Sequence, residues 1–251
     1  MDTKELFSRK ADNYAKYRWD YSLDAVRAIF DITHIGLQSS VADIGAGTGI
    51  LTKHFIGKVK TIYAIEPNPE MRKLAEKNFF GKKDCIVVPG SAEATTLPDQ
   101  WINLITVAQA IKWFDPIRSR HEFMRIMKPG GWLAILSNYG TDLELEAEIE
   151  RISTSDYGVD LSIISSLPER QPPQFYYGND DFRKLKFSFS VKNNWESYIG
   201  ALLSTSFIPD EDHPLYPKFE LAVREVFDHH CHDGILEVHG ETELLIGKMS
   251  P

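Results

Sequence analysis

Short apolar runs alternate with segments of helical spacing through the first 140 residues of the chain. The apolar runs, typical of strands, cover residues 39–45, 61–67, 85–90, 101–110 and 132–139. Segments with helical periodicity lie between them, at 50–58, 68–79 and 115–127. Residues 128–131, Lys-Pro-Gly-Gly, predict a stop and a turn after the last of these helices. This alternation predicts βαβ units and a parallel sheet covered by helices on both faces.

The pattern changes after residue 140. Helices are expected over 141–152, 194–206 and 214–230, a strand over 182–192, and one or two strands over 235–248 around Gly240. Residues 156–181 are rich in proline, glycine and tyrosine and predict a loop. We divide a single domain, 1–251, into an N-terminal helical cover (1–38), a core (39–140), a cap that holds the substrate region (141–232) and the final strands (233–251).

Composition narrows the class of protein. The chain is 43% hydrophobic and 25% charged, as globular proteins are, and no stretch reaches the roughly 20 apolar residues of a membrane span. The first ten residues are charged and lack the apolar segment of a signal peptide. Two cysteines are too few for a disulfide framework, which favours the cytoplasm. A net charge of −8 argues against nucleic-acid partners, so a small-molecule enzyme is the default expectation.

A glycine-rich loop follows the first predicted strand. Its glycines, Gly45, Gly47 and Gly49, depart from the dinucleotide fingerprint G-x-G-x-x-G because the third comes one residue early. Asp43 would repel a pyrophosphate, whereas its carboxylate suits a ligand with a positive end. The N–H groups of the following helix suit a carboxylate. An amino-acid zwitterion satisfies both features, and a tight turn without a ligand is the alternative.

Glu66 ends the second predicted strand, 23 residues after Asp43. An acidic residue at about this distance past a glycine loop can accept hydrogen bonds from ribose hydroxyls. Pro67 follows it. Met71, one turn into the next predicted helix, can pack against a base or belong to the core.

Five motifs in this order resemble those of class I S-adenosylmethionine (AdoMet)-dependent methyltransferases. They are VADIGAGTG (41–49), YAIEPNPEM (63–71), GSAEATTLP (90–98), ITVAQAIKWF (105–114) and MKPGGWLAI (127–135), which together span residues 39–139. The segments ADNYAKYRWDYS (11–22) and SFIP (206–209) further resemble a small-molecule subgroup that includes trans-aconitate methyltransferase-like proteins. The resemblance implies a Rossmann-like, doubly wound, mostly parallel α/β sheet of about seven strands, with the helical cap inserted late in the chain.

The resemblance also implies roles for single residues in holding S-adenosyl-L-methionine. Asp43 and the loop Gly45, Ala46, Gly47 and Gly49 would hold the methionine moiety, Glu66 with Pro67 the ribose, and Met71 the adenine. Ala92 and Glu93 would meet the adenine edge, and Gln109 would line the channel near the sulfonium. Many relatives have histidine where this chain has Lys112, which puts in doubt any base at that position.

Candidates for the methyl acceptor's site are aromatic and basic. Tyr14, Tyr17 and Arg18 would fold over the cofactor in the family pattern, with Arg18 meeting a carboxylate. The alternative is an amphipathic helix with its tyrosines in the core. Trp113 and Tyr139 end two predicted strands and are candidate pocket walls. No catalytic residue is assigned, because orientation at an activated methyl group can suffice without a base.

The run Asp228-His229-His230-Cys231-His232-Asp233 has metal-ligand residue types but lacks a second cluster at zinc spacing. We expect no metal and interpret the run as a polar helix end stopped by Gly234.

The leading hypothesis is a methyltransferase acting on a small molecule, with its acceptor atom and its oligomeric state left open. A non-catalytic protein that binds AdoMet or S-adenosylhomocysteine on the same fold is one alternative. An NAD-dependent oxidoreductase is another, opposed by the glycine spacing and Asp43.

Overall fold

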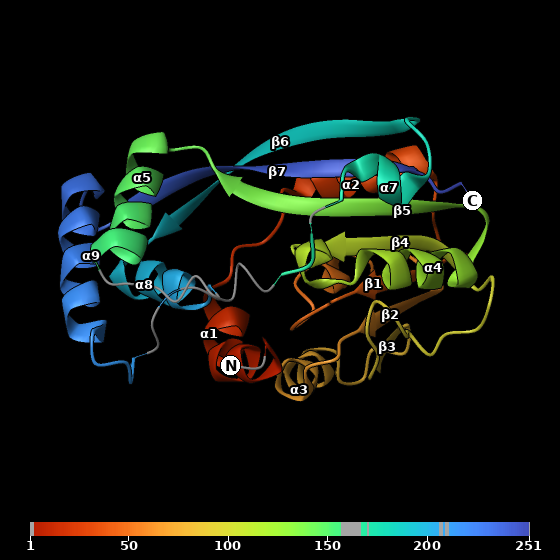
Figure 1. Cartoon of the computed structure of the whole chain (residues 1–251), viewed down its shortest axis with the longest axis horizontal. Helices are drawn as coiled ribbons and strands as arrows, with labels where there is room; N and C mark the ends of the chain where they lie inside the picture. The colour runs from red at the N-terminus through yellow and green to blue at the C-terminus, as the bar shows by residue number, and fades with distance from the viewer. Residues whose placement is uncertain (1–2, 157–166, 170, 206–207, 209–210, 251) are drawn as a thin grey trace. The chain divides into compact units, whose positions relative to one another are not determined.

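A seven-stranded sheet organises the described part of the chain. The computed structural model describes residues 3–156, 167–169, 171–205, 208 and 211–250. Its strands are β1 (Ser40–Ile44), β2 (Thr61–Ile65), β3 (Cys85–Val88), β4 (Ile102–Ala108), β5 (Met127–Gly140), β6 (Phe182–Asn193) and β7 (Leu236–Lys248). They lie in the order β3-β2-β1-β4-β5-β7-β6 (Figure 1). The pairs β1–β2, β1–β4, β2–β3 and β4–β5 are parallel, which confirms the predicted Rossmann-like α/β fold.

The helices mostly begin and end close to where the sequence predicts. They are α1 (Thr3–Tyr17), α2 (Leu23–Thr33), α3 (Pro69–Asn78), α4 (Pro116–Ile126), α5 (Leu143–Arg151), α7 (Pro173–Tyr177), α8 (Trp195–Leu203) and α9 (Tyr216–His230), with short turns η1 (Thr52–His54), η2 (Ile111–Trp113) and η3 (Ile152–Asp156). Asn68 and Asp115 begin α3 and α4, since each side chain accepts a backbone N–H of the first turn and a proline follows.

Contacts between Cα atoms divide the chain into two compact units. Unit 1 comprises residues 1–19, 139–166 and 188–241, and unit 2 comprises 20–138, 167–187 and 242–251. The predicted cap therefore shares its unit with the N-terminal helix, and residues 167–187 belong with the core. The division of one domain into cover, core, cap and final strands stays a prediction.

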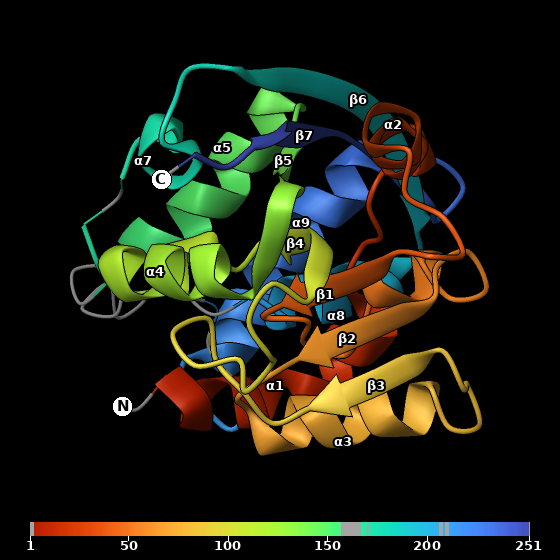
Figure 2. The same cartoon turned by 90° about the vertical axis from the view of Figure 1, so that its right-hand side faces the viewer.

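Unit 2 buries an apolar layer on each face of its sheet. On one face, α4 and α7 pack against strand residues such as Ile44, Ile105 and Ile135. On the other, α2 and the turn η1 pack against Val41, Ile62 and other strand residues. Figure 2 shows α2 and α4 on opposite sides of the strands. Because both faces are covered, the strands are near-continuous apolar runs, as parallel strands should be.

Unit 1 has its own apolar core. Helices α5, α8 and α9 bury a cluster against the unit 1 part of β7; its largest members are Tyr198, Phe219 and Phe227. Trp195 and Phe227 meet edge to face, with ring centroids 5.5 Å apart.

The helix predicted over 50–58 is wrong in extent. The segment forms only the three-residue 3₁₀ turn η1 and further turns. Ile50, Thr52 and Ile56 are β-branched, which disfavours a helix, and Gly57 has a left-handed φ of 75°. The Thr52 hydroxyl also donates a hydrogen bond to Asp43, at 2.6 Å, which anchors the turn to β1.

The turn predicted at residues 128–131 is wrong as a separate element. These residues begin β5, where the register with β4 passes from Ile102↔Met127 to Leu104↔Trp132. The extra residues form a bulge at Gly130, whose φ is 74°. Gly130 therefore has the left-handed φ that is typical of a turn, but it lies inside the strand β5.

One further expectation needs correction, and the structure decides between the one or two strands expected over 235–248. The loop predicted over 156–181 contains α7, and residues 157–166 and 170 lie outside the described residues. The segment 235–248 forms the single strand β7, which continues through Gly240.

Candidate functional site

The glycine loop lies at the carboxyl end of β1, where the strand order turns from β2 on one side to β4 on the other. In open α/β sheets a ligand site forms at such a switch point. Gly45, Gly47 and Gly49 have φ values of 72°, 58° and 89°, a region that glycine enters without strain. The backbone N–H groups of Gly45 and Ala46 both donate to the carbonyl of Ile65, at 2.9 and 3.0 Å. The loop is thus fixed to the end of β2.

Asp43 is buried beneath this loop. Its side chain is 1% exposed, and its two carboxylate oxygens accept hydrogen bonds from Thr52 Oγ1 at 2.6 Å and Thr106 Oγ1 at 2.9 Å. Burial raises the pKa of Asp43 to about 6, although the two hydroxyl groups oppose this shift. The predicted contact of this carboxylate with a ligand amine stays a prediction.

Glu66 ends β2 with its carboxylate beside the loop. Oε2 accepts the N–H of Gly47 and Oε1 accepts the N–H of Asn68, each at 2.8 Å. Burial raises the pKa of Glu66, and the two backbone hydrogen bonds oppose the shift. Because a carboxylate has about four acceptor positions, two remain for further donors such as a ribose diol. Pro67 beside it is exposed.

Met71 and Ala92 are each 3% exposed. Met71 lies in the first turn of α3, where its N–H donates to the Asn68 side chain at 3.0 Å. Ala92 belongs to the core cluster of α4 and α7. Their predicted contacts with the adenine stay predictions.

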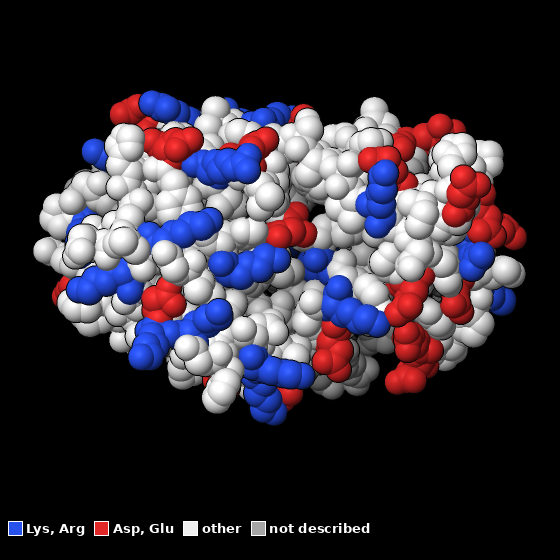
Figure 3. All heavy atoms as spheres, turned by 180° about the vertical axis from the view of Figure 1, so that it is seen from behind, with Lys and Arg blue, Asp and Glu red and all other residues white. Residues whose placement is uncertain are grey.

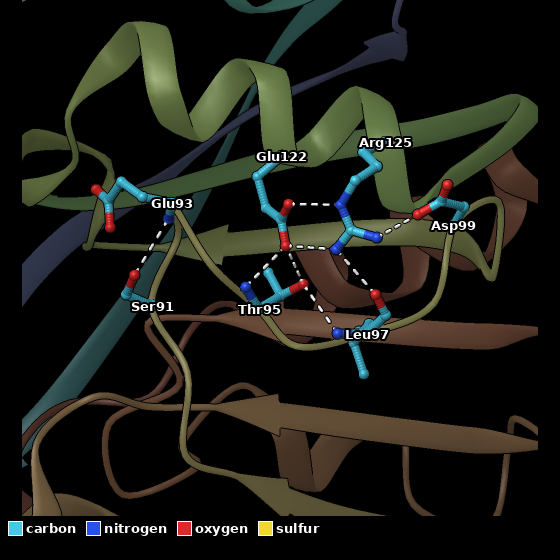
Figure 4. Close-up of polar contacts among 7 residues, drawn as sticks. All are labelled: Ser91, Glu93, Thr95, Leu97, Asp99, Glu122 and Arg125. Atoms are coloured by element: carbon cyan, nitrogen blue, oxygen red, sulfur yellow. Dashed lines mark hydrogen bonds and ion pairs between the residues drawn. The ribbon is translucent and has the colours of Figure 1, made fainter.

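Glu93 fixes the loop after β3 to α4. Its Oε1 accepts the N–H of Asp115 at 2.9 Å, and its own N–H donates to Ser91 Oγ at 3.3 Å (Figure 4). Asp115 begins α4, so the glutamate links the predicted adenine edge to the start of that helix.

A buried ion pair holds the rest of this loop (Figure 4). Glu122, which is 6% exposed, accepts hydrogen bonds from the N–H and hydroxyl of Thr95 and from Arg125 at 2.8 Å. Arg125 also donates to the carbonyl of Leu97, at 2.8 Å, and to Asp99. Burial raises the pKa of Glu122, but the hydrogen bonds from Arg125 and Thr95 outweigh it and lower the pKa to about 2.

Glu122→Gln should lower the free energy of unfolding at pH 7 by about 1–3 kcal/mol, the usual worth of hydrogen bonds to a charged group. Since the folded-state pKa of Glu122 is depressed, its contribution is present above the ordinary glutamate pKa and is lost as the pH falls towards 2. Urea unfolding at pH 7 and pH 3 measures both effects, and the difference between wild type and variant should shrink at pH 3.

Asp99→Asn is the matched control for this prediction. Asp99 binds the same Arg125 but its side chain is 75% exposed, so its loss should cost less than about 1 kcal/mol. Equal losses of unfolding free energy in Glu122→Gln and Asp99→Asn would contradict a larger contribution from the buried Glu122.

Gln109 turns sharply out of β4. It has a φ of 57°, its N–H donates to the carbonyl of Leu136, and its Nε2 donates to the carbonyl of Asn138, both at 2.9 Å. The side chain is therefore held against the end of β5. In the following turn η2, the Lys112 ammonium lies 5.4 Å from the centroid of the half-buried Trp113 ring.

Four predicted acceptor-site residues belong to unit 1. The Tyr17 hydroxyl donates to Glu196 at 2.6 Å, and the Arg18 guanidinium lies 5.7 Å from the ring centroid of Tyr14. Tyr139 is 47% exposed. Their part in binding an acceptor, and that of Trp113 in unit 2, stays a prediction.

Comparisons with known proteins find methyltransferases similar to part of this chain. Residues 42–135 match the model of a family described as "Methyltransferase domain". An uncharacterized methyltransferase of Mycobacterium tuberculosis is 35% identical over 98 residues, 39% of each chain. A methyltransferase-like protein of Schizosaccharomyces pombe is 33% identical over 57% of this chain and 54% of its own. The matches thus span about two fifths to half of these relatives' lengths.

The fold agrees over nearly the whole chain. A putative type II methyltransferase from Anaeromyxobacter dehalogenans superposes with a TM-score of 0.61 at 18% identity, over 94% of this chain and 99% of that one. Residues 42–135 therefore match a methyltransferase domain, and the chain has the fold of this solved methyltransferase structure. The trans-aconitate methyltransferase-like subgroup is not established by these matches.

Several side chains that shape this candidate site were not predicted from the sequence. Thr52 and Thr106 hold the Asp43 carboxylate, and Asn68 holds both Glu66 and the first turn of α3. Thr106 carried a signal, because it is a polar residue inside the apolar run Ile102–Ala108 and is fully buried. Asn68 carried another, as a cap residue directly before Pro69.

Within the described residues of this protein, no three His, Cys, Asp or Glu side chains are grouped so as to hold a metal ion. The helix α9 ends at His230, where the sequence predicts its end, but its last cap residue is Cys231, and Gly234 lies in the turn that follows. None of the described helices is long and apolar enough to span a membrane.

Proposed function

We propose that this protein transfers the methyl group of AdoMet to a small-molecule acceptor by in-line displacement. The observation that carries the proposal is the position of Glu66, whose carboxylate accepts the N–H of Gly47 and retains acceptor positions at the switch point of the sheet. The residues fit the cofactor. Glu66 can receive the two ribose hydroxyls, and the buried anion of Asp43 favours the cationic end.

The bound cofactor supplies an activated methyl group, and the protein supplies position and electrostatics. The glycine loop would hold the methionine end of the cofactor against the backbone, and the loop at Glu93 would contact the adenine. Gln109 borders the place where the acceptor would approach. Holding the two reactants in line can contribute about 7–11 kcal/mol of barrier reduction without an assigned base.

The distribution of charge supports a small acceptor over a nucleic acid. Unit 1, which contains the proposed acceptor residues Tyr14, Tyr17, Arg18 and Tyr139, holds 20 Asp and Glu against 9 Lys and Arg. Acidic side chains gather over the unit that holds α5 and α9 (Figure 3). Unit 2 holds 16 Asp and Glu against 19 Lys and Arg, and in Figure 3 the two kinds are interspersed. Phosphate backbones require a continuous basic surface.

Calorimetric titration of the purified protein with AdoMet, S-adenosylhomocysteine and NAD tests this proposal. Saturable binding of the first two without NAD is expected. Glu66→Ala should weaken AdoMet binding at least tenfold, because hydrogen bonds to a charged group contribute about 1.5–3 kcal/mol. Glu76→Gln, an exposed glutamate on α3, is the matched control and should bind as wild type does.

Binding of NAD alone would overturn the cofactor assignment. Binding of AdoMet without transfer, in a screen over small carboxylates, amines and hydroxyl compounds, would favour the alternative of a non-catalytic AdoMet-binding protein. The cytoplasmic location, the small acceptor and the absence of nucleic-acid or membrane partners are parts of the same proposal.

A further inference from the structure

Three residues of unit 2 stand where the chain passes into or out of unit 1. Three of the five passages fall between residues 19 and 20, 138 and 139, and 241 and 242, and Asp20, Asn138 and Thr242 are the unit 2 residues next to these three. These positions are more than 100 residues apart along the chain. In the structure they belong to one set of hydrogen bonds.

Asn138 is the centre of this set. Its Nδ2 donates to the carbonyl of Asp20 at 3.1 Å, and its Oδ1 accepts the hydroxyl of Thr242 at 2.7 Å. The same hydroxyl oxygen accepts the N–H of Ser22 at 2.9 Å. Thr242 is fully buried and Ser22 is 6% exposed, so the hydrogen bond between them is shielded from water, whereas Asn138 and Asp20 are half-buried. We call Asp20, Ser22, Asn138 and Thr242 the crossing node.

One arm of the crossing node reaches the proposed cofactor site at the end of β4. The carbonyl of Asn138 accepts Nε2 of Gln109 at 2.9 Å, while the N–H of Gln109 donates to Leu136. The left-handed φ of Gln109 is unusual for a residue with a side chain and needs support from its surroundings. Asn138 supplies part of that support.

A second arm reaches the turn behind the glycine loop. The carboxylate of Asp20 lies 2.8 Å from Nε2 of His54 and 2.8 Å from Nζ of Lys53, both in η1. The turn η1 begins three residues after Gly49 and supplies the Thr52 hydroxyl to Asp43. The crossing node therefore contacts two segments beside the proposed cofactor site. One is Gln109 after β4, and the other is the turn η1 after the glycine loop.

We propose that Asn138 and Thr242 are positioning residues that hold Gln109 and the segment 20–22 in the arrangement that binds the cofactor. The inference rests on the proposed function, in which Gln109 and the glycine loop bind AdoMet. A buried network with every member satisfied specifies one arrangement of its segments, whereas apolar packing tolerates several. Loosening the node is expected to loosen Gln109.

The test compares Thr242→Val, which keeps the shape and removes the hydroxyl, with Thr242→Ser, which restores it. Amide hydrogen exchange is followed over residues 20–22 and 108–111, and S-adenosylhomocysteine affinity is measured where every variant is folded. Thr242→Val should accelerate exchange in both segments and weaken affinity at least fivefold, the lower end of typical couplings between sites. Thr242→Ser should return both readouts to near wild type.

Thr33→Val is the matched control. The Thr33 hydroxyl also donates to a carbonyl, that of Ile29 at 2.6 Å, and accepts a backbone N–H, that of Ile35. It lies in unit 2 at the end of α2, outside the node. This variant should lose stability without a change in affinity or in exchange over 108–111.

Unchanged exchange over 108–111 in Thr242→Val, together with wild-type affinity, would overturn the inference and leave the node a purely structural feature. If the wild type binds no S-adenosylhomocysteine, the proposed function fails. Exchange over 108–111 in the ligand-free protein then decides the positioning role by itself.

Discussion

Gly49→Ala is expected to lower the free energy of unfolding by about 2–5 kcal/mol and to abolish measurable AdoMet binding. Two costs add. The φ of 89° is unfavourable for alanine by about 1–2 kcal/mol. A Cβ at this position would also lie 2.3 Å from two atoms of the Phe79 ring, and overpacking a buried ring costs about 1–3 kcal/mol. Phe79 is only 8% exposed, so its ring has little room to withdraw.

Gly57→Ala separates the two costs. Gly57 has a φ of 75°, but a Cβ there meets nothing within 4 Å, so its replacement should cost only the strain of about 1–2 kcal/mol. The double variant Gly49→Ala with Phe79→Leu should recover part of the clash. Urea unfolding and calorimetric titration measure both properties. Equal losses at Gly49 and Gly57 would show that close packing under the loop does not matter.

The positions of the strands could be predicted because the central parallel strands are mostly buried on both faces and are therefore compact apolar runs. The runs at 39–45 and 61–67 contain β1 and β2. The bulge at 128–131 could not be predicted, because Lys-Pro-Gly-Gly has the same composition whether the chain ends an element or inserts residues into one. The extent of η1 depends on the hydrogen bond of Thr52 to Asp43, a contact that sequence periodicity does not report.

The acidic residues of the site were predictable, and their partners were not. Asp43 and Glu66 stand at strand ends, where register alone places them at one edge of the sheet. The hydroxyl of Thr106 comes from a neighbouring strand, and the pairing that brings it to Asp43 is known only from the fold. The crossing node was still harder to predict, because Asp20 and Thr242 come together only after the chain has passed four times between the two units.

Asp43→Asn is expected to stabilise the ligand-free protein at pH 7–8 while weakening its affinity for AdoMet. Burial raises the pKa of Asp43 from 3.8 to about 6, so the folded protein favours the protonated carboxyl. The protonated Asp43 therefore adds to the free energy of unfolding. This contribution is fully present below the pKa that Asp43 has in the unfolded chain, and it is lost as the pH rises through about 6. At about 1.4 kcal/mol per pKa unit the loss is about 3 kcal/mol.

Asparagine avoids this loss without leaving a polar atom unpaired, because its oxygen can accept one threonine hydroxyl and its amide can donate to the other. The stability of the variant relative to the wild type should therefore grow between pH 4 and pH 6 and level off above. Urea unfolding across that range measures it. A constant difference would mean that Asp43 does not titrate there.

Binding should change in the opposite direction. AdoMet carries a sulfonium and an ammonium group, and a buried anion attracts them more strongly than an exposed one would. The affinity of the wild type should rise with pH up to about 6 as Asp43 ionises, whereas that of Asp43→Asn should stay low and flat. Calorimetric titration at pH 5, 6 and 7.5 distinguishes the two profiles. Such a result would mean that Asp43, although its buried charge destabilises the ligand-free protein, is needed for binding the cofactor.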